Sequence, residues 1–306
     1  MSELKRSPLR RLRRQAGTRV PRRKITLAVV PAILTLGNGV CGMASIAVVT
    51  SLYLPWSEDT KLLVAGLLIF AGMLFDALDG SAARITGGES EFGGELDSLC
   101  DAITFGAAPA VIVWRFGDGQ TLPPKLVWGM GVLFAMCVLI RLARFNVETD
   151  EDDSHEGFEG LPSPAAAGTL AAIAIAMSEI NGYSIAAGYA PWVVSTAAWV
   201  LLATQYLMPL LALVLAALMV SRYQYPHLFS RFLTNRRGPN QIGQALFLAV
   251  GFALFHWLAL PIAFLAYALG FPIRETLRGG PAGETPIASP GPEDDEAVRR
   301  EAHRAV

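Results

Sequence analysis

The sequence predicts an all-α integral membrane protein with eight membrane-spanning helices. Hydrophobic residues make up 53% of its 306 residues and the mean hydropathy is +0.42, both high for a soluble globular protein. The middle of the chain contains stretches of about twenty residues almost without charge, which is the length that a helix needs to cross a bilayer. The basic residues are concentrated instead at the start, because the first 24 residues hold ten of the 25 Lys and Arg.

The spanning helices are expected in seven apolar runs. The first run is long enough for one tilted helix, and a short interfacial piece at 25–33 can precede its membrane-crossing part. We divide the last run at Pro261 into helices over 240–256 and 258–272, because proline interrupts a helix. Without this division the chain has seven spans, which is the competing count. The runs cover 27–54, 61–78, 96–114, 124–143, 163–180, 191–221 and 240–272.

Loop charges predict which ends of these helices face the cytoplasm. The ten basic residues before the first span place the N-terminus there, since Lys and Arg are enriched in short cytoplasmic loops. The acidic loop at 147–159 does not alter this prediction, because the rule counts positive residues only. The basic N-terminal segment is therefore interpreted as a topology signal that also contacts anionic lipid, and not as a nucleic-acid site. Alternation of the spans then puts in the cytoplasm the segments 79–95, 144–162, 222–239 and the C-terminal tail.

We expect a multi-pass protein of the cell (inner) membrane, and these patterns divide its chain into four regions. The last region is rich in Gly, Pro, Ala and charge, so we expect it to be disordered. Cys41, Cys100 and Cys137 lie far apart in apolar runs without CxxC spacing, and we expect free, buried thiols. The regions are a basic cytoplasmic segment (1–26), a transmembrane core (27–221), a cytoplasmic loop with a C-terminal transmembrane hairpin (222–274) and a cytoplasmic tail (275–306).

Four aspartates within residues 76–101 lie at the predicted cytoplasmic ends of the second and third spans. Asp76 and Asp79 are three residues apart, and Asp97 and Asp101 are four apart, so each pair shares one face of its helix. Converging carboxylates repel one another unless protons or cations neutralise them. Carboxylate oxygens suit Mg²⁺ or Mn²⁺, which keep open positions for phosphate oxygens. We therefore interpret the four as a metal site and not as surface aspartates solvated by water.

The residues between the aspartates favour a phosphate-containing substrate. Gly80 and Ala83 remove side-chain bulk from the helix face that carries the first pair, so a bulky group can approach the backbone. Arg84 adds a planar set of donors that matches phosphate geometry. Acids, small residues and an arginine at these intervals indicate a metal-assisted site for a diphosphate-containing substrate.

The same residues resemble the motif of a known family of membrane enzymes. They read DxxDGxxAR and, after eight further residues, GxxxDxxxD, in which Gly93 is the first glycine. This pattern is similar, without departure, to that of the CDP-alcohol phosphotransferases, also called class I CDP-alcohol phosphatidyltransferases. The resemblance implies a core of six transmembrane helices over 27–221, a homodimer, and an active site open to the cytoplasm. Two further C-terminal helices would extend this core.

The resemblance also implies a reaction and residue roles. An alcohol hydroxyl attacks the β-phosphorus of a CDP-linked lipid and releases CMP. Two divalent ions, Mg²⁺ or Mn²⁺, would be held by Asp76, Asp79 and Asp97, with Asp101 near the second ion and also serving as the base that takes the hydroxyl proton. Asn38, in the first span, is interpreted either as a nucleotide contact or as a helix–helix hydrogen bond. The other nucleotide contacts implied are Gly80, Ala83, Arg84 and Ser90.

A second group of polar residues, outside the motif, bears on the acceptor alcohol. Arg141 and Arg144 are three residues apart at the cytoplasmic end of the fourth span, and Asn146 follows. They are interpreted either as a helix cap with membrane anchoring or as a pocket for a carboxylate or phosphate. The surrounding stretches, RLARFNVET and FEGLPSPAAAG, resemble the phosphatidylserine synthase branch of the family. That resemblance implies CDP-diacylglycerol and L-serine as substrates, with Arg141 or Arg144 binding the serine carboxylate.

Three other functions are kept as alternatives. A sibling enzyme would use glycerol 3-phosphate, inositol phosphate or choline as its acceptor. A divalent-cation transporter would place its acids near the middle of the bilayer, whereas these aspartates gather at one face. A catalytically silent scaffold is disfavoured because all four acids and Arg84 are intact. In each case membrane lipids are expected partners and nucleic acid is not.

Overall fold

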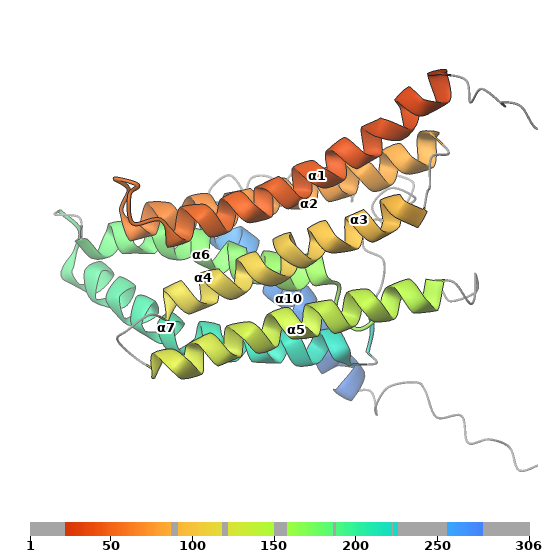
Figure 1. Cartoon of the computed structure of the whole chain (residues 1–306). Coiled ribbons are helices and arrows are strands. Elements are labelled where there is room, and N and C mark those ends of the chain that lie inside the picture. Colours follow the sequence, from red (N-terminus) through yellow and green to blue (C-terminus); the bar gives the residue numbers. More distant parts are fainter. Residues whose placement is uncertain are drawn as a thin grey trace, which may run out of the picture.

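The described part of the chain is a bundle of long helices (Figure 1). The computed structural model describes residues 22–86, 91–117, 122–149, 158–185, 188–221, 223–225 and 256–277. Two short strands, β1 (Phe158–Glu159) and β2 (Gln224–Tyr225), form one antiparallel pair. The helices are α1 (Arg22–Thr50), α2 (Glu58–Thr86), α3 (Glu91–Asp101), the π-helix η2 (Ala102–Ala107), α4 (Ala108–Phe116), α5 (Pro124–Thr149), α6 (Ser163–Ile185), α7 (Pro191–Val220) and α10 (His256–Leu277).

Six helical spans in the described residues are long and apolar enough to cross a membrane. The third of them is formed jointly by α3, η2 and α4. This result confirms the prediction of an all-α, multi-pass membrane protein, and all six spans lie inside 27–221. The three cysteines are free, as predicted. The spans are Val30–Thr50, Glu58–Ala82, Phe92–Phe116, Pro124–Val147, Ser163–Ser184 and Pro191–Val220.

Two of these spans differ in detail from the apolar runs that predicted them. α1 continues through Pro31, so the first run forms one long helix and not a separate interfacial piece at 25–33. The third span begins at Glu91, ahead of the predicted start at 96. Its first turns (EFGGELDS) mix polar and apolar residues, and such amphipathic turns do not register as an apolar run.

The described C-terminal part is a single helix, α10. It covers the predicted helix at 258–272, runs past the expected boundary at 274, and contains Pro261 without a break. Its apolar part, Leu258–Arg274, is shorter than the six spans. The predicted partner helix at 240–256 lies outside the described residues except for its last residue, and so does the tail from 278 onward. The count of eight spans therefore stays a prediction.

Several of the other helices pack against α6. Its residues 165–177 are all buried, and α2, α7 and α10 contact it. Small side chains allow this close approach, since this stretch is mostly alanine and glycine. Gly168 faces the ring of Phe264 from α10, which also packs against Phe70 of α2 with ring centroids 5.6 Å apart. α10 is thereby held against the centre of the bundle.

The segment before α6 is tied to the end of α7. The N–H of Gly160 donates to the carbonyl of Tyr223 (2.8 Å), and the N–H of Leu161 donates to the carbonyl of Leu218 (3.0 Å). Gly160 has a φ of +80°, and a Cβ there would collide with the backbone of the last turn of α7. Glycine is therefore required at this turn. These bonds fix the start of α6 at Ser163, beside the candidate site described below.

We expect Gly42→Ala to destabilise the contact between α1 and η2. A Cβ at residue 42 would lie 2.5 Å from Thr104 Oγ1 and 2.7 Å from Thr104 Cα, and the backbone atom cannot rotate away. Overpacking of this kind costs about 1–3 kcal/mol, so the midpoint of thermal unfolding in detergent should fall. The matched control is Gly129→Ala in α5, where an added Cβ has nothing within 4 Å. Equal midpoints for the two variants would contradict the close contact.

Candidate active site

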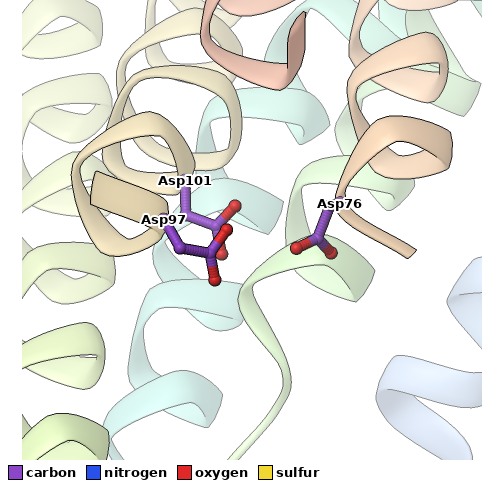
Figure 2. A group of neighbouring side chains, drawn as sticks. All are labelled: Asp76, Asp97 and Asp101. Atoms are coloured by element: carbon purple, nitrogen blue, oxygen red, sulfur yellow. The ribbon is translucent and has the colours of Figure 1, made fainter. Parts of the chain in front are cut away.

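Three of the four predicted aspartates meet between α2 and α3. One carboxylate oxygen from each of Asp76, Asp97 and Asp101 lies within 4.8 Å of the other two. Figure 2 shows Asp97 and Asp101 on one helix, and Asp76 across from them on another. The four-residue spacing puts the α3 pair on one face, which is the face turned toward α2. Helix spacing thus places Asp97 and Asp101 on one face, and the arrangement of α2 and α3 brings Asp76 to them.

The fourth aspartate, Asp79, is buried on α2 but is not part of this three-carboxylate group. It interacts electrostatically with the other three aspartates. Thr35 of α1 lies beside it. The four carboxylates therefore form one electrostatic cluster, in which only three bring their oxygens close enough together to share a ligand.

The cluster has the donor chemistry of a divalent metal site. Asp97 Oδ1 and Asp79 Oδ2 are buried and receive no hydrogen bond from a described residue. None of the four carboxylates forms a salt bridge with a described Lys or Arg. Buried, unpaired negative charge is costly, and a divalent cation with hard oxygen ligands removes this cost. Mg²⁺ or Mn²⁺ therefore fits the residues that are present.

Asn38 holds the carboxylate of Asp101 in place. Its Nδ2 donates to Asp101 Oδ1 over 2.8 Å, and both side chains are buried. The carbonyl of Asn38 accepts a hydrogen bond from Thr104 Oγ1 (2.9 Å). Gly72 of α2 leaves room for this arrangement, because a Cβ there would lie 2.5 Å from the Thr104 methyl group and 2.9 Å from Asn38 Oδ1. The structure therefore contains the helix–helix hydrogen bond predicted for Asn38, and its nucleotide contact stays a prediction.

A π-helical turn follows Asp101 directly. η2 occupies Ala102–Ala107 between α3 and α4. π-helical turns are rare overall, but those that occur inside α-helices are frequently found at functional sites. Asp101 and Thr104, which are three residues apart at the start of this turn, both hydrogen-bond to Asn38 of α1. Thr104 was not predicted from the sequence, where the available signal was a hydroxyl residue near the start of an apolar run.

The predicted nucleotide contacts are only partly described. An added Cβ at Gly80 would have nothing within 4 Å, which agrees with the predicted open space beside α2. Ala83 and Arg84 belong to α2, but their side chains lie outside the description. Ser90 lies outside the described residues altogether. The roles of these four residues stay predictions.

Arg141 of α5 is a partly buried cation that faces the carboxylate cluster. Its Nη1 donates to Ser163 Oγ at the start of α6, over 3.2 Å. It interacts electrostatically with Asp101. Within the described residues it has no salt bridge, and its Nε is buried without a hydrogen-bond partner. A guanidinium in this situation is suited to an anionic ligand.

The two other acceptor-pocket candidates lie further along α5. Asn146 is engaged in a pair of hydrogen bonds with Ser98, at 3.0 Å and 3.2 Å, which fastens the end of α5 to α3. Both the Nδ2 donor and the Oδ1 acceptor of Asn146 are thus engaged by Ser98, which leaves fewer hydrogen bonds for a substrate. Arg144 lies almost one turn beyond Arg141 and is half-buried. Arg141 is therefore the candidate for which the surroundings most favour anion binding.

Comparison with known proteins agrees with this geometry. The family model described as CDP-alcohol phosphatidyltransferase matches residues 28–202, which is more than half of the chain. The chain belongs to this family. The match confirms the resemblance stated from the aspartate motif, and it includes α2, α3 and α5, which carry the candidate site. It ends within α7, so α10 lies outside it.

Bacterial relatives share a common name, CDP-diacylglycerol–serine O-phosphatidyltransferase. One from Mycobacterium leprae is 37% identical over 150 residues, which are 48% of this chain and 46% of the relative. One from Helicobacter pylori is 36% identical over 141 residues, covering 46% and 55%. One from Bacillus subtilis is 33% identical over 155 residues, covering 49% and 78%. The chain thus spans about half the length of the mycobacterial relatives that it matches.

Proposed function

We propose that the protein transfers the phosphatidyl group of CDP-diacylglycerol to the hydroxyl of L-serine, giving phosphatidylserine and CMP. The observation that carries the proposal is the cluster of Asp76, Asp97 and Asp101, in a chain that belongs to the CDP-alcohol phosphatidyltransferase family. The name shared by the relatives supports serine as the acceptor. The enzyme would work as a homodimer in the inner membrane, with the site, the N-terminus and the C-terminal tail facing the cytoplasm.

Two divalent ions, Mg²⁺ or Mn²⁺, belong to this proposal. Divalent-metal dependence is general in the family, and the carboxylate cluster provides the ligands. Asp76, Asp79 and Asp97 would hold the ions, with Asp101 beside the second. When bound, the ions polarise the diphosphate oxygens and stabilise the negative charge on the departing CMP.

Asp101 is the proposed general base. Its carboxylate takes the proton of the acceptor hydroxyl as the hydroxyl oxygen bonds to the β-phosphorus, and the bond from that phosphorus to the CMP oxygen breaks. Because Asn38 donates a hydrogen bond to Asp101 Oδ1, Asp101 Oδ2 is the oxygen that would take the proton of the acceptor hydroxyl. Gly80, Ala83, Arg84 and Ser90 would contact the nucleotide.

The acceptor pocket is proposed around Arg141. Its guanidinium, which has no salt bridge within the described residues, would bind the serine carboxylate while the serine hydroxyl reaches Asp101. Choline has no anionic group and fits this pocket poorly. Glycerol 3-phosphate and inositol phosphate are anionic, so they are the alternatives to be tested. A cation transporter is disfavoured by family membership and by the position of the cluster beside one group of helix ends.

The direct test is acceptor-dependent CMP release. The purified full-length protein, in mixed micelles with CDP-diacylglycerol and Mn²⁺ or Mg²⁺, should release CMP when L-serine is added. It should release none above background with glycerol 3-phosphate, inositol phosphate or choline. CMP release with one of those acceptors and none with serine would overturn the serine assignment while leaving the reaction class in place.

We expect Arg141→Gln to raise the KM for serine by about 10- to 100-fold, the size of one lost hydrogen bond to a charged group. The KM for CDP-diacylglycerol should stay unchanged, because the substitution removes only the partner of the acceptor anion. The matched control is Arg115→Gln, which removes a different cation that bonds to Glu58 over 2.8 Å in another part of the bundle. Equal serine KM values for Arg141→Gln and the wild type would rule out Arg141 as the carboxylate ligand.

A further inference from the structure

α10 is not covered by the family match, yet it packs against the helix at the centre of the bundle. The match ends at residue 202, and α10 begins at His256. α10 and α6 are in contact. A helix added for anchorage alone would need only a lipid-facing surface. α10 instead occupies a place next to the residues of the proposed acceptor pocket.

The contacts along α10 define which of its turns lies beside that pocket. Phe264 faces Gly168, in the second turn of α6. Further along, the carbonyl of Ala268 accepts a hydrogen bond from the hydroxyl of Tyr225 in β2, over 2.9 Å. β2 pairs with β1, and β1 directly precedes the start of α6. The turn of α10 around residue 267 is therefore held near the start of α6, where Ser163 binds Arg141.

Tyr267 is the polar residue of this turn. Its ring packs edge-on or tilted against Tyr225 and Phe271, with centroids 5.7 Å apart in both cases. It interacts electrostatically with Arg141, which in turn interacts with Asp101. The hydroxyl of Tyr267 makes no hydrogen bond to a described residue, and the side chain is only half-buried. A phenol held in place by ring contacts therefore lies near the start of α6, where the guanidinium of Arg141 has no salt bridge within the described residues.

We propose that Tyr267 of α10 is a specificity-determining residue that binds the anionic group of the acceptor together with Arg141. This inference rests on the proposed function and adds a residue from outside the family match to the site. The phenol would donate to one carboxylate oxygen of serine, and the guanidinium to the other. The rings around Tyr267 limit water at this place, which strengthens both hydrogen bonds.

The test uses Tyr267→Phe in the full-length enzyme, because this change removes the hydroxyl and keeps the ring packing. The KM for serine should rise by about 10-fold, with kcat within about twofold and the KM for CDP-diacylglycerol unchanged. A second readout needs no turnover: serine raises the midpoint of thermal unfolding of the wild type in proportion to its binding, and the variant should require about 10-fold more serine for the same shift.

Tyr206→Phe is the matched control, at an exposed tyrosine of α7 that lies outside the aromatic group. It removes a hydroxyl of the same kind, so its serine KM should stay that of the wild type. If Tyr267→Phe has the wild-type serine KM, or if both variants raise it equally, α10 acts only as packing and the inference is overturned. Failure of the proposed function gives a different result, since the wild type itself would then release no CMP with serine.

Discussion

Asp101→Asn should lower CMP release by about 10²- to 10⁴-fold, which is the usual contribution of a positioned general base. Asparagine has nearly the same shape, and its Oδ1 can still accept the hydrogen bond from Asn38 that Asp101 accepts over 2.8 Å. What disappears is the negative oxygen that takes the proton of the acceptor hydroxyl. The loss should therefore fall on kcat, and the unfolding midpoint should stay near that of the wild type.

The control for this experiment is Glu95→Gln, which neutralises an exposed carboxylate on the same helix. Its CMP release should stay within about twofold of the wild type, because surface charges contribute little to local structure. Both proteins are to be assayed with saturating CDP-diacylglycerol, serine and Mn²⁺. Retention of more than about a tenth of the wild-type rate by Asp101→Asn would remove Asp101 from the role of general base.

The pairing of Asp97 and Asp101 could be predicted from the sequence because helix periodicity brings it about, and the order of the spans then places Asp76 near them. Asp97 and Asp101 must share one face of any helix that contains both. Two consecutive spans joined by a short loop usually lie side by side, so acids at their adjoining ends come close together. The six spans could be predicted for a similar reason, since a bilayer requires long apolar helices. In both cases a local pattern determines the outcome without knowledge of the packing.

The residues that orient the cluster could not be predicted, because they depend on how helices rotate against one another. The π-helical turn after Asp101 has no signature in the hydropathy pattern, and neither has the hydrogen bond from Thr104, within that turn, to the carbonyl of Asn38. Asp79 has the same spacing argument as Asp76, but it does not join the three-carboxylate group. The presence of Pro261 inside α10 has a related explanation, since membrane helices tolerate proline when neighbouring helices support them.

The position of α10 shows the same dependence on packing. Its hydropathy predicts a helix and nothing more, and the contact of Phe264 with Gly168 is what brings it beside α6. Once α10 lies there, Tyr267 and Arg141 become neighbours although they are far apart in the chain. Local patterns therefore identify the metal ligands, while the acceptor pocket arises from contacts between helices that are distant in sequence.

Metal removal is the second change with a large expected effect. Chelation with EDTA should abolish CMP release, and added Mn²⁺ or Mg²⁺ should restore it. The clustered carboxylates and the substrate diphosphate are both negatively charged, so cations are needed to hold them together. Asp97→Asn should raise the Mn²⁺ concentration for half-maximal activity by at least about 10-fold, since even the loss of a group that only orients a metal ligand weakens metal binding by that much. The reason is that Asp97 Oδ1 is buried and receives no hydrogen bond from a described residue, so a cation is the partner that it lacks.

Asp59→Asn provides the matched control, since it neutralises an aspartate at the opposite end of α2. Its Oδ2 accepts a hydrogen bond from Asn181 over 2.6 Å, and it takes no part in the cluster. The dependence of its activity on Mn²⁺ concentration should match that of the wild type. For Asp97→Asn the same activity curve should move to higher Mn²⁺ concentration, because a site that has lost one carboxylate ligand needs more Mn²⁺ to be filled. Coincident curves for the two variants would mean that Asp97 binds no metal, and the assignment of the whole cluster would then have to be withdrawn, because Asp97 supplies one of its three converging oxygens.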